Sequence, residues 1–420
     1  MQVKTVSLLV AMTVTVASGL TVVVEGQQSD EAADPVRTLV GRLDLERYKA
    51  TIEGLTQFGD RRQGTQRNRD AVDWIEAQLQ AAGCASTERI AYTFTPRPRP
   101  RTGGGGRGGT RPPLNPTDPT PTGGRIGRNG TGPGGSSIFG YRRPTGVVRD
   151  PMAQPNEALR ELNSEEPTPG ERTEVYCTKV GTTNPDEMYI IGAHMDGHGF
   201  GEAANDDGSG TAVVMELARI FSAPGVRTGR SIRFALWNNE ETGLNGSRAY
   251  VEQRRERQGR EDPPGSGRYP EPRWLGMIQH DMMLFDHGAP GPDGVVSRDQ
   301  RREADVNIEF QSSSDLANES RDLAFFFKAA SDAYATDYPA MVGPHMTNTD
   351  STPFMNVVPS ISLRENERGM HVGAGWDPHW HQPTDLYGTF TDDDFRLGLN
   401  AAQTTLAAIA QLVDAEINIR

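Results

Sequence analysis

The stretch MYIIGAHMDG, residues 188–197, places a histidine and an aspartate directly after a short, mostly apolar strand. A run such as 188–193 is typical of strands buried inside a sheet. His194 and Asp196 follow it at once. Functional sites of open α/β sheets form at the carboxyl ends of parallel strands. We therefore expect both side chains at the carboxyl edge of a central sheet.

Strands and helices alternate around this stretch. Further strand-like runs occur at residues 90–94, 174–180, 231–237, 275–279, 305–310 and 359–363. Apolar residues at helical spacing occur at 36–54, 68–82, 210–221, 314–335 and 392–415. Alternation of this kind predicts an α/β fold with helices on both faces of a sheet.

Further polar residues are expected at the same edge. They follow the strands 231–237 and 275–279 or lie on the loops 203–210 and 376–385, and they are Glu240, Glu241, Asp281, Asp206 and His381. Carboxylates gathered and desolvated at one edge repel one another, and cations would relieve that repulsion. A mixed imidazole and carboxylate set suits zinc, and the number of side chains fits two ions that share a bridging carboxylate.

Five segments resemble the co-catalytic zinc exopeptidases, a family that includes bacterial leucyl aminopeptidases, aminopeptidase Y and glutamate carboxypeptidase. In the family's order they are IIGAHMDG, ANDDGSGTAVVMELAR, FALWNNEETGLNGS, IQHD and HQPTD, and residues 55–84 resemble the family's lead-in. The resemblance implies a three-layer α/β/α fold with a mixed, mostly parallel central sheet, of the phosphorylase/hydrolase-like type. It also implies two Zn²⁺ ions per chain and hydrolysis of terminal peptide bonds.

The resemblance gives each matching residue a role. His194 and Asp281 would bind one zinc ion. Glu241 and His381 would bind the other, and Asp206 would bridge both.

Three further roles follow from the resemblance. Asp196 would accept a hydrogen bond from the His194 ring and fix its tautomer. Glu240 would be the catalytic general base, taking a proton from water and passing it to the leaving amine. The Asp206–Asp207 peptide bond would be cis.

The family's tyrosine electrophile has no clear counterpart in this chain. Met346 stands near its place, and His345 is the candidate for stabilising the oxyanion. Because the HxPxD-like frame favours His381 as the ligand, His379 is not expected to bind metal. The remaining histidines are expected to be structural or surface residues, and they are His198, His280, His287 and His371.

Composition divides the chain into four parts. Residues 1–26 are typical of a secretory signal peptide, because Lys4 precedes an apolar run that polar residues follow. An uncleaved membrane anchor is the alternative. Residues 36–94 and 171–420 form the expected catalytic domain. Between them lies a Gly-, Pro- and Arg-rich low-complexity insertion, residues 95–170, which cannot bury enough apolar surface to offset its ordering entropy.

The signal peptide predicts a secreted or periplasmic protein without stable membrane contact after cleavage. The chain has only two cysteines, Cys84 and Cys177. In an oxidising compartment an even number predicts one disulfide, and two buried free thiols are the alternative.

The formal net charge of −13 argues against a nucleic-acid partner, because such proteins normally carry a basic patch. The resemblance to the zinc exopeptidases implies a peptide substrate, and the sequence leaves the oligomeric state open.

An aminopeptidase is favoured because that activity is frequent in the family. A carboxypeptidase would need basic anchors such as Arg364 and Arg368, although arginines of this kind are more often surface charges. Two different functions would also suit the same fold. One is a glutaminyl cyclase, which uses one zinc ion for acyl transfer, and the second is a non-catalytic binding ectodomain.

Overall fold

The computed structural model describes residues 11–15, 21–25, 34–84, 86–95, 147–288, 296–344, 349–365 and 377–417. They belong to two units, Met1–Asp34 and Pro35–Arg420. In the first unit, β1 (Ala11–Thr15) pairs antiparallel with β2 (Thr21–Glu25). Among the described residues, no helix has the length and apolar character needed to cross a bilayer. The signal peptide expected at 1–26 stays a prediction.

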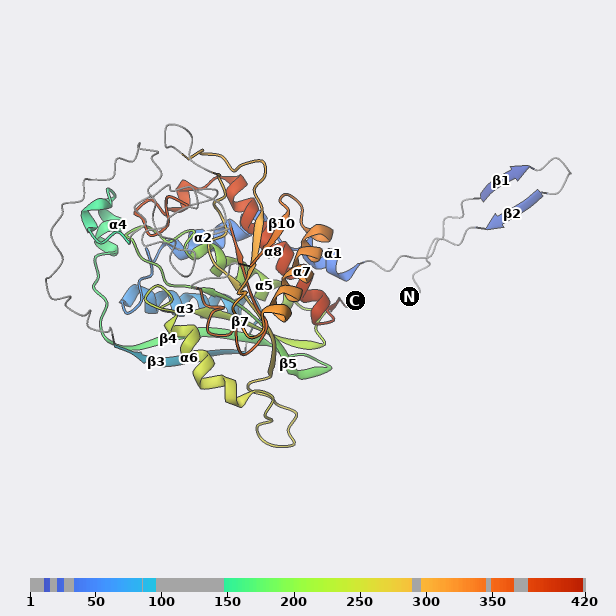
Figure 1. The fold of residues 1–420 in the computed structure, drawn as a ribbon, viewed down its shortest axis with the longest axis horizontal. Helices are drawn as coiled ribbons and strands as arrows, with labels where there is room; N and C mark the ends of the chain where they lie inside the picture. The colour runs from blue at the N-terminus through green and yellow to red at the C-terminus, as the bar shows by residue number, and fades with distance from the viewer. Residues whose placement is uncertain are drawn as a thin grey trace, which may run out of the picture. The chain divides into compact units, whose positions relative to one another are not determined.

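The second unit is built on an eight-stranded sheet with the order β10-β9-β11-β8-β5-β7-β4-β3. Five of its strands, β3, β4, β5, β7 and β10, are labelled in Figure 1. Its strands are β3 (Thr87–Phe94), β4 (Gly170–Lys179), β5 (Asn184–His194), β7 (Arg230–Trp237), β8 (Arg273–His280), β9 (Val306–Phe310), β10 (Ala340–Gly343) and β11 (Ser360–Arg364). The central strands β11, β8, β5 and β7 run parallel, whereas β4, β3 and β9 pair antiparallel with their inner neighbours. The expected mixed, mostly parallel sheet is confirmed.

The central strands are covered on both faces. In β5, Ile191 and Ala193 belong to the larger apolar core, whereas Met188 and Ile190 belong to a smaller core. Successive side chains of a strand point to opposite faces, so the two cores lie on opposite sides of the sheet. This is why the sequence of β5 is continuously apolar rather than alternating.

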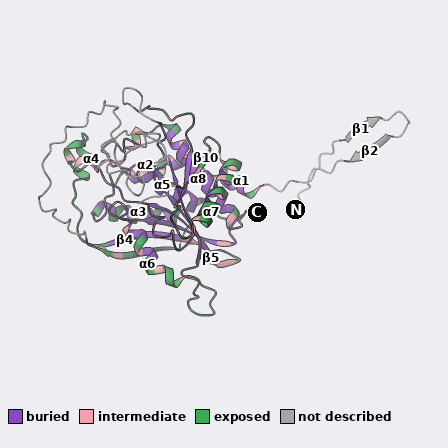
Figure 2. Ribbon diagram, viewed as in Figure 1, coloured by how far each residue is buried: buried purple, intermediate pink, exposed green. Residues whose placement is uncertain are grey.

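Helices on the two faces differ in number. The larger core is covered by α1 (Pro35–Val40), α2 (Leu45–Thr56), α3 (Gln66–Ala81), α5 (Gly208–Ser222), α7 (Ala317–Tyr334) and α8 (Asp392–Leu412). On the opposite face, α6 (Asn245–Arg254) contributes Tyr250 and Val251 to the smaller core. Helices α5 and α8 are buried along nearly their whole length (Figure 2). Short strands β6 (Val226–Arg227) and β12 (Glu416–Ile417) pair separately.

The single helix expected at 36–54 is two helices, α1 and α2. Asp44 begins the second, because its carboxylate accepts a hydrogen bond from the backbone N–H of Arg47 at 2.9 Å. The other expected helices coincide with α3, α5, α7 and α8 to within a few residues.

The end of the expected insertion is more ordered than its composition suggests. Residues 147–169 contain the 3-10 turn η1 (Pro151–Ala153) and the helix α4 (Glu157–Leu162). The side chain of Asn163 donates to the carbonyl of Gly201 at 2.7 Å, which ties this segment to the main body. Buried hydrogen bonds of this kind, together with the buried side chain of Leu159, therefore help to order this part of the chain. Residues 96–146 lie outside the described part of the chain.

A disulfide joins Cys84, just beyond α3, to Cys177 in β4. Both cysteines are buried, and they are 93 residues apart in sequence. The bond predicted from the even cysteine count is confirmed. It closes a chain segment that contains β3 and the whole low-complexity insertion, so it restricts the unfolded chain over that length.

We expect the double variant Cys84→Ser/Cys177→Ser to lose about 2–4 kcal/mol of stability, because the unfolded chain regains its loop entropy. Urea unfolding of the oxidised wild type and the variant measures the loss. Reduced wild type should match the variant. Equal midpoints for oxidised and reduced wild type would contradict the expectation.

His287 links the loop after β8 to the start of α8. Its Nε2 atom is 2.7 Å from Asp394 Oδ1, and its Nδ1 atom is 2.8 Å from the carbonyl of Ser297. Asp394 also accepts the backbone N–H of Thr391 in a capping box. Burial acts to lower the pKa of His287, but the hydrogen bonds to Asp394 and Ser297 and the nearby carboxylate charges together outweigh it, and the net pKa is raised.

A raised folded-state pKa stabilises the fold at low pH. The contribution of His287 should be fully present below about pH 6.5, the ordinary histidine pKa, and should fade as pH rises through the folded-state pKa. We expect His287→Gln to cost about 1.5–3 kcal/mol at pH 6 and less at pH 9. Urea unfolding of both proteins at both pH values checks this, and a pH-independent difference would refute it.

Candidate metal centre

His194, Asp206 and Asp281 lie together at the carboxyl edge of the sheet. His194 ends β5, Asp281 follows β8, and Asp206 lies on the loop before α5. The Nε2 atom of His194 is 3.3 Å from Asp206 Oδ1 and 4.0 Å from Asp281 Oδ1. One ligand atom from each residue lies within 4.8 Å of the other two. The three side chains are thus close enough to share one cation.

A second set of side chains lies on the other side of Asp206. The Nε2 atom of His381 is 3.1 Å from Asp206 Oδ2 and 2.9 Å from Glu241 Oε2. His198 joins this set, with its Nε2 atom 2.9 Å from the same Glu241 oxygen. Each oxygen of Asp206 therefore faces a different histidine, which is the arrangement expected of a bridging carboxylate.

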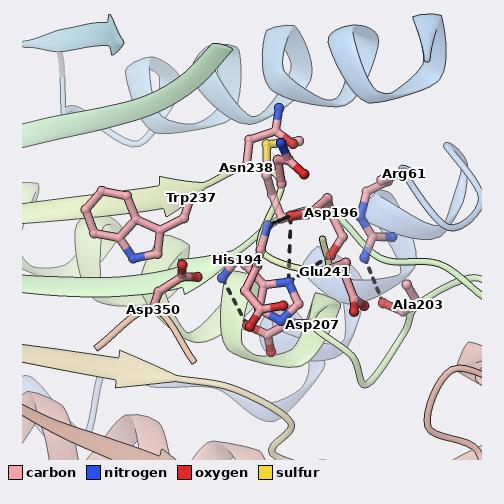
Figure 3. A network of polar contacts seen from close by, with 12 residues as sticks. Arg61, His194, Asp196, Ala203, Asp207, Trp237, Asn238, Glu241 and Asp350 are labelled. Atoms are coloured by element: carbon pink, nitrogen blue, oxygen red, sulfur yellow. Dashed lines mark hydrogen bonds and ion pairs between the residues drawn. The ribbon is translucent and has the colours of Figure 1, made fainter. Parts of the chain in front are cut away.

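Asp207 holds three segments of the site in register. One oxygen of its carboxylate accepts the backbone N–H of His194 at 3.2 Å. The second oxygen accepts the N–H of Gly210 at 2.9 Å, which caps α5, and the N–H of Met282 at 3.1 Å. The peptide bond Asp206–Asp207 is cis, as the family resemblance implied. Through these three hydrogen bonds the side chain of Asp207 joins the ends of β5 and β8 to the start of α5, and Figure 3 shows it beside His194.

Asp385 attaches the loop that carries His381. Its carboxylate accepts the backbone N–H groups of Asn205 at 2.8 Å and of Asp206 at 3.1 Å. Because His381 and Asp385 lie on one short loop, this contact brings the histidine against Asp206.

Several buried polar atoms in the two sets make no hydrogen bond within the described residues: Asp206 Oδ2, Glu241 Oε1 and His198 Nε2. Asp206 Oδ2 lies 3.1 Å from His381 Nε2, and His198 Nε2 lies 2.9 Å from Glu241 Oε2, but neither contact has hydrogen-bond geometry. A buried polar atom without a hydrogen bond costs on the order of 1–3 kcal/mol, so such atoms require an explanation. Imidazole nitrogens and carboxylate oxygens are the ligands that zinc prefers. The unpaired atoms and the kind of donor both fit bound divalent cations.

Charged groups within the two sets strongly shift the pKa values of their neighbours. Burial acts to lower the pKa of His381, but Glu241 and Asp206 outweigh it and raise that pKa to about 9. Burial acts to raise the pKa of Glu241, but His198 and His381 lower it to about 2. The His381 imidazole and the carboxylates beside it thus favour each other's charged forms. A divalent cation would neutralise the carboxylates instead and release protons on binding.

Asp196 contacts the His194 ring through its backbone carbonyl and not, as expected, through its carboxylate. The Nδ1 atom of His194 is 2.8 Å from the backbone carbonyl of Asp196, whereas the carboxylate is 3.9 Å away. The main chain therefore fixes the tautomer, because residue 196 turns back under the ring directly after the strand. The carboxylate instead accepts the backbone N–H of Glu240 at 2.9 Å.

Glu240 belongs to neither metal-ligand set among the described residues. Its backbone is held by Asp196, and its side chain is buried. Burial raises the pKa of Glu240 well above the ordinary value; His194 opposes this, and Asp350 adds to it. A buried carboxylate whose pKa is raised binds a proton more readily than an exposed one, so it is suited to accept and return a proton.

Two residues have contacts at the centre that the sequence does not predict. The sequence leaves Arg364 as a surface charge or a substrate anchor, but it is buried and its Nη2 atom donates to Asp281 Oδ2 at 2.9 Å. It therefore orients a candidate ligand. The sequence predicts a structural or surface role for His198, yet this residue lies in the second set. The available signal is its position four residues after His194, in the loop that directly follows the same strand.

Some expected residues lie outside the described part of the chain: His345, Met346, Arg368 and His371. His345 as a stabiliser of the oxyanion stays a prediction. The Nδ1 atom of His379 is 2.8 Å from the hydroxyl of Thr384, and among the described residues His379 is in neither metal-ligand set.

A cavity of about 1270 Å³ lies beside the second set. Its lining includes His198 and Glu241, together with Val148 and Pro167 from the ordered end of the expected insertion. That segment therefore forms a wall of the space next to the metal centre.

Comparison with sequence families gives one match over the region that holds the centre. The profile described as "Peptidase family M28" matches residues 175–396, which is more than half of the 420 residues.

Individual relatives are similar over shorter regions. An aminopeptidase of Pseudomonas aeruginosa is 30% identical over 168 residues, covering 38% of this chain and 30% of that protein. Aminopeptidase YwaD of Bacillus subtilis is 44% identical over 69 residues, 16% of this chain and 14% of that protein. Carboxypeptidase Q of Xenopus laevis is 34% identical over 73 residues, 17% of this chain and 16% of that protein. The similar regions thus span less than a third of each of these relatives.

Solved structures share the fold. A zinc aminopeptidase from Bacillus subtilis has a TM-score of 0.57 at 16% identity, covering 88% of this chain and 95% of that one. A glutaminyl cyclase from Porphyromonas gingivalis has a TM-score of 0.51 at 15% identity, covering 88% and 99%. Since enzymes of both kinds share the architecture, the fold alone does not choose between them.

Proposed function

The chain belongs to peptidase family M28, and on that basis we propose that it is an exported zinc exopeptidase that acts as an aminopeptidase. The observation that carries this proposal is the position of Asp206 between two sets of metal-binding side chains. His194 and Asp281 would hold one zinc ion, and Glu241 and His381 would hold the second. An enzyme that uses one metal ion would need only one of these two sets of side chains.

The two ions, when bound, would polarise the scissile carbonyl and lower the pKa of an attacking water toward neutrality. Glu240 accepts the proton that this water loses as its oxygen bonds to the carbonyl carbon. It then delivers the proton to the amine nitrogen as the C–N bond breaks. The buried position of Glu240 and its raised pKa both support this role.

Neighbouring residues keep this chemistry in place. Arg364 holds Asp281, and the carbonyl of Asp196 holds the His194 ring so that its Nε2 atom faces the centre. Because the hydrogen-bonding partner of Nδ1 is a carbonyl, Nδ1 carries the proton and Nε2 is free to bind a metal.

Export is supported by the disulfide, which is rare in reducing compartments. Mass determination of the mature N-terminus after expression in a secreting host tests it. Cleavage near residues 17–26 is expected, and an intact N-terminus in the cell extract would contradict export.

The activity is tested on aminoacyl anilides and on peptides blocked at either end. We expect chelator-sensitive hydrolysis of substrates with a free amine and two zinc ions per chain by elemental analysis. Turnover only with a free carboxylate would indicate a carboxypeptidase. One zinc ion with pyroglutamate formation from an N-terminal glutamine would indicate the cyclase reaction.

We expect Glu240→Gln to reduce kcat by roughly 10²–10⁴-fold, because the amide cannot shuttle the proton. Its zinc content should equal that of the wild type. Steady-state kinetics and elemental analysis on the same preparations check both statements. A near-normal rate would remove Glu240 from the mechanism.

We expect Asp206→Ala to lose both zinc ions, because its two oxygens face the two sets. Elemental analysis of the purified variant measures the loss. The exposed carboxylate Asp299 gives a matched control, since Asp299→Ala should keep both ions. Retention of two zinc ions by Asp206→Ala would contradict the bridging role.

A further inference from the structure

His198 approaches the same carboxylate oxygen as His381. Both Nε2 atoms lie 2.9 Å from Glu241 Oε2. The two imidazole rings meet edge to face, with centroids 4.1 Å apart and planes at 88°. Two imidazoles that converge on one buried carboxylate would repel each other if both were protonated, whereas a shared cation would satisfy both.

The loop that carries His198 is anchored on both sides of it. Arg61 is fully buried, and its guanidinium donates to the carbonyl of Met195 at 2.8 Å before the histidine. After the histidine it donates to the carbonyls of Glu202 at 2.8 Å and Ala203 at 2.7 Å. Figure 3 shows Arg61 pointing at Ala203. One buried side chain thus fixes the path of the loop that presents His198.

The same loop lies directly against the backbone of the His381 loop. Gly199 has φ +105°, and a Cβ atom there would come within 2.4 Å of the His381 main chain. Gln154 joins the two loops, because its side-chain amide donates to the carbonyls of Phe200 at 2.7 Å and Pro383 at 3.0 Å. The two imidazoles are therefore brought together by the packing of both loops.

The atoms at the meeting point lack hydrogen-bond partners. Among the described residues, His198 Nε2, Glu241 Oε1 and Asp206 Oδ2 are buried and make no hydrogen bond. His198 Nε2 is close to Glu241 but not in hydrogen-bond geometry with it. Atoms that converge in this way on a common point are placed as ligands of one ion.

We propose that His198 is an additional ligand of the zinc ion that Glu241, His381 and Asp206 bind. This rests on the proposed two-zinc centre. The second ion then has four protein ligands, whereas the first has three, His194, Asp206 and Asp281. Four ligands are typical of closed zinc sites, and three leave a position for water or substrate. The second ion would therefore be bound more tightly than the first.

The proposal is tested by calorimetric titration of chelator-treated protein with Zn²⁺. Wild type should bind two ions with unequal affinity. His198→Ala and the conservative His198→Gln should each weaken the tighter event by at least about 100-fold, more than loss of an outer contact costs. The weaker event should stay within about threefold of wild type. Added imidazole should restore the tighter event in His198→Ala, because it can occupy the position that the side chain leaves.

Two variants serve as controls. His381→Ala should weaken the same event as His198→Ala, whereas His379→Ala, from the same loop but outside both sets, should weaken neither. The assignment of His198 is overturned if both His198 variants lose less than about 100-fold in affinity for the tighter ion, or if imidazole does not reverse the loss. Failure of wild type to bind two ions would instead refute the two-zinc centre itself.

Discussion

The centre depends on hydrogen bonds that the side chains of Asn205 and Asp207 accept from backbone N–H groups of other segments. Asp207 accepts N–H groups from the end of β5, the start of α5 and the chain after β8. Asn205 accepts the N–H groups of Met283 and Leu284. Because these donors belong to segments far apart in sequence, the loop 205–207 sets their relative positions. Asp206, held between its two neighbours, then lies where both sets of ligands meet.

The energetic cost of this arrangement is the burial of many carboxylates. Such groups resist desolvation when they are charged, and like charges raise one another's pKa. Ion pairs offset part of this desolvation cost. Arg364 pairs with Asp281, and histidine imidazoles pair with Asp206 and Glu241. Under the proposed function, divalent cations would neutralise the remaining carboxylate charge. Metal binding would then be coupled to the stability of this sheet edge.

The architecture is shared with enzymes of different chemistry, so the side chains at the edge must decide the function. The second set of ligands and the cavity beside it are what would distinguish a two-metal peptidase from a one-metal acyltransferase. Residues between 147 and 167 form one wall of that cavity, and they directly follow the low-complexity stretch in the sequence. Variation in such a segment can change the substrate without altering the sheet.

The amino-acid sequence was enough to predict the sheet class and the residues at its edge, because buried parallel strands are continuously apolar and polar residues follow their ends. It was also enough to predict the disulfide, from two cysteines and a signal-like N-terminus. Three contacts emerged from the folded chain alone: His198 joins Glu241, Arg364 is buried against Asp281, and a carbonyl rather than the Asp196 carboxylate fixes His194. Loop paths set these contacts. Arg61 and Gln154 impose such paths through hydrogen bonds between residues 134 and 229 positions apart, which leave no local pattern in the sequence.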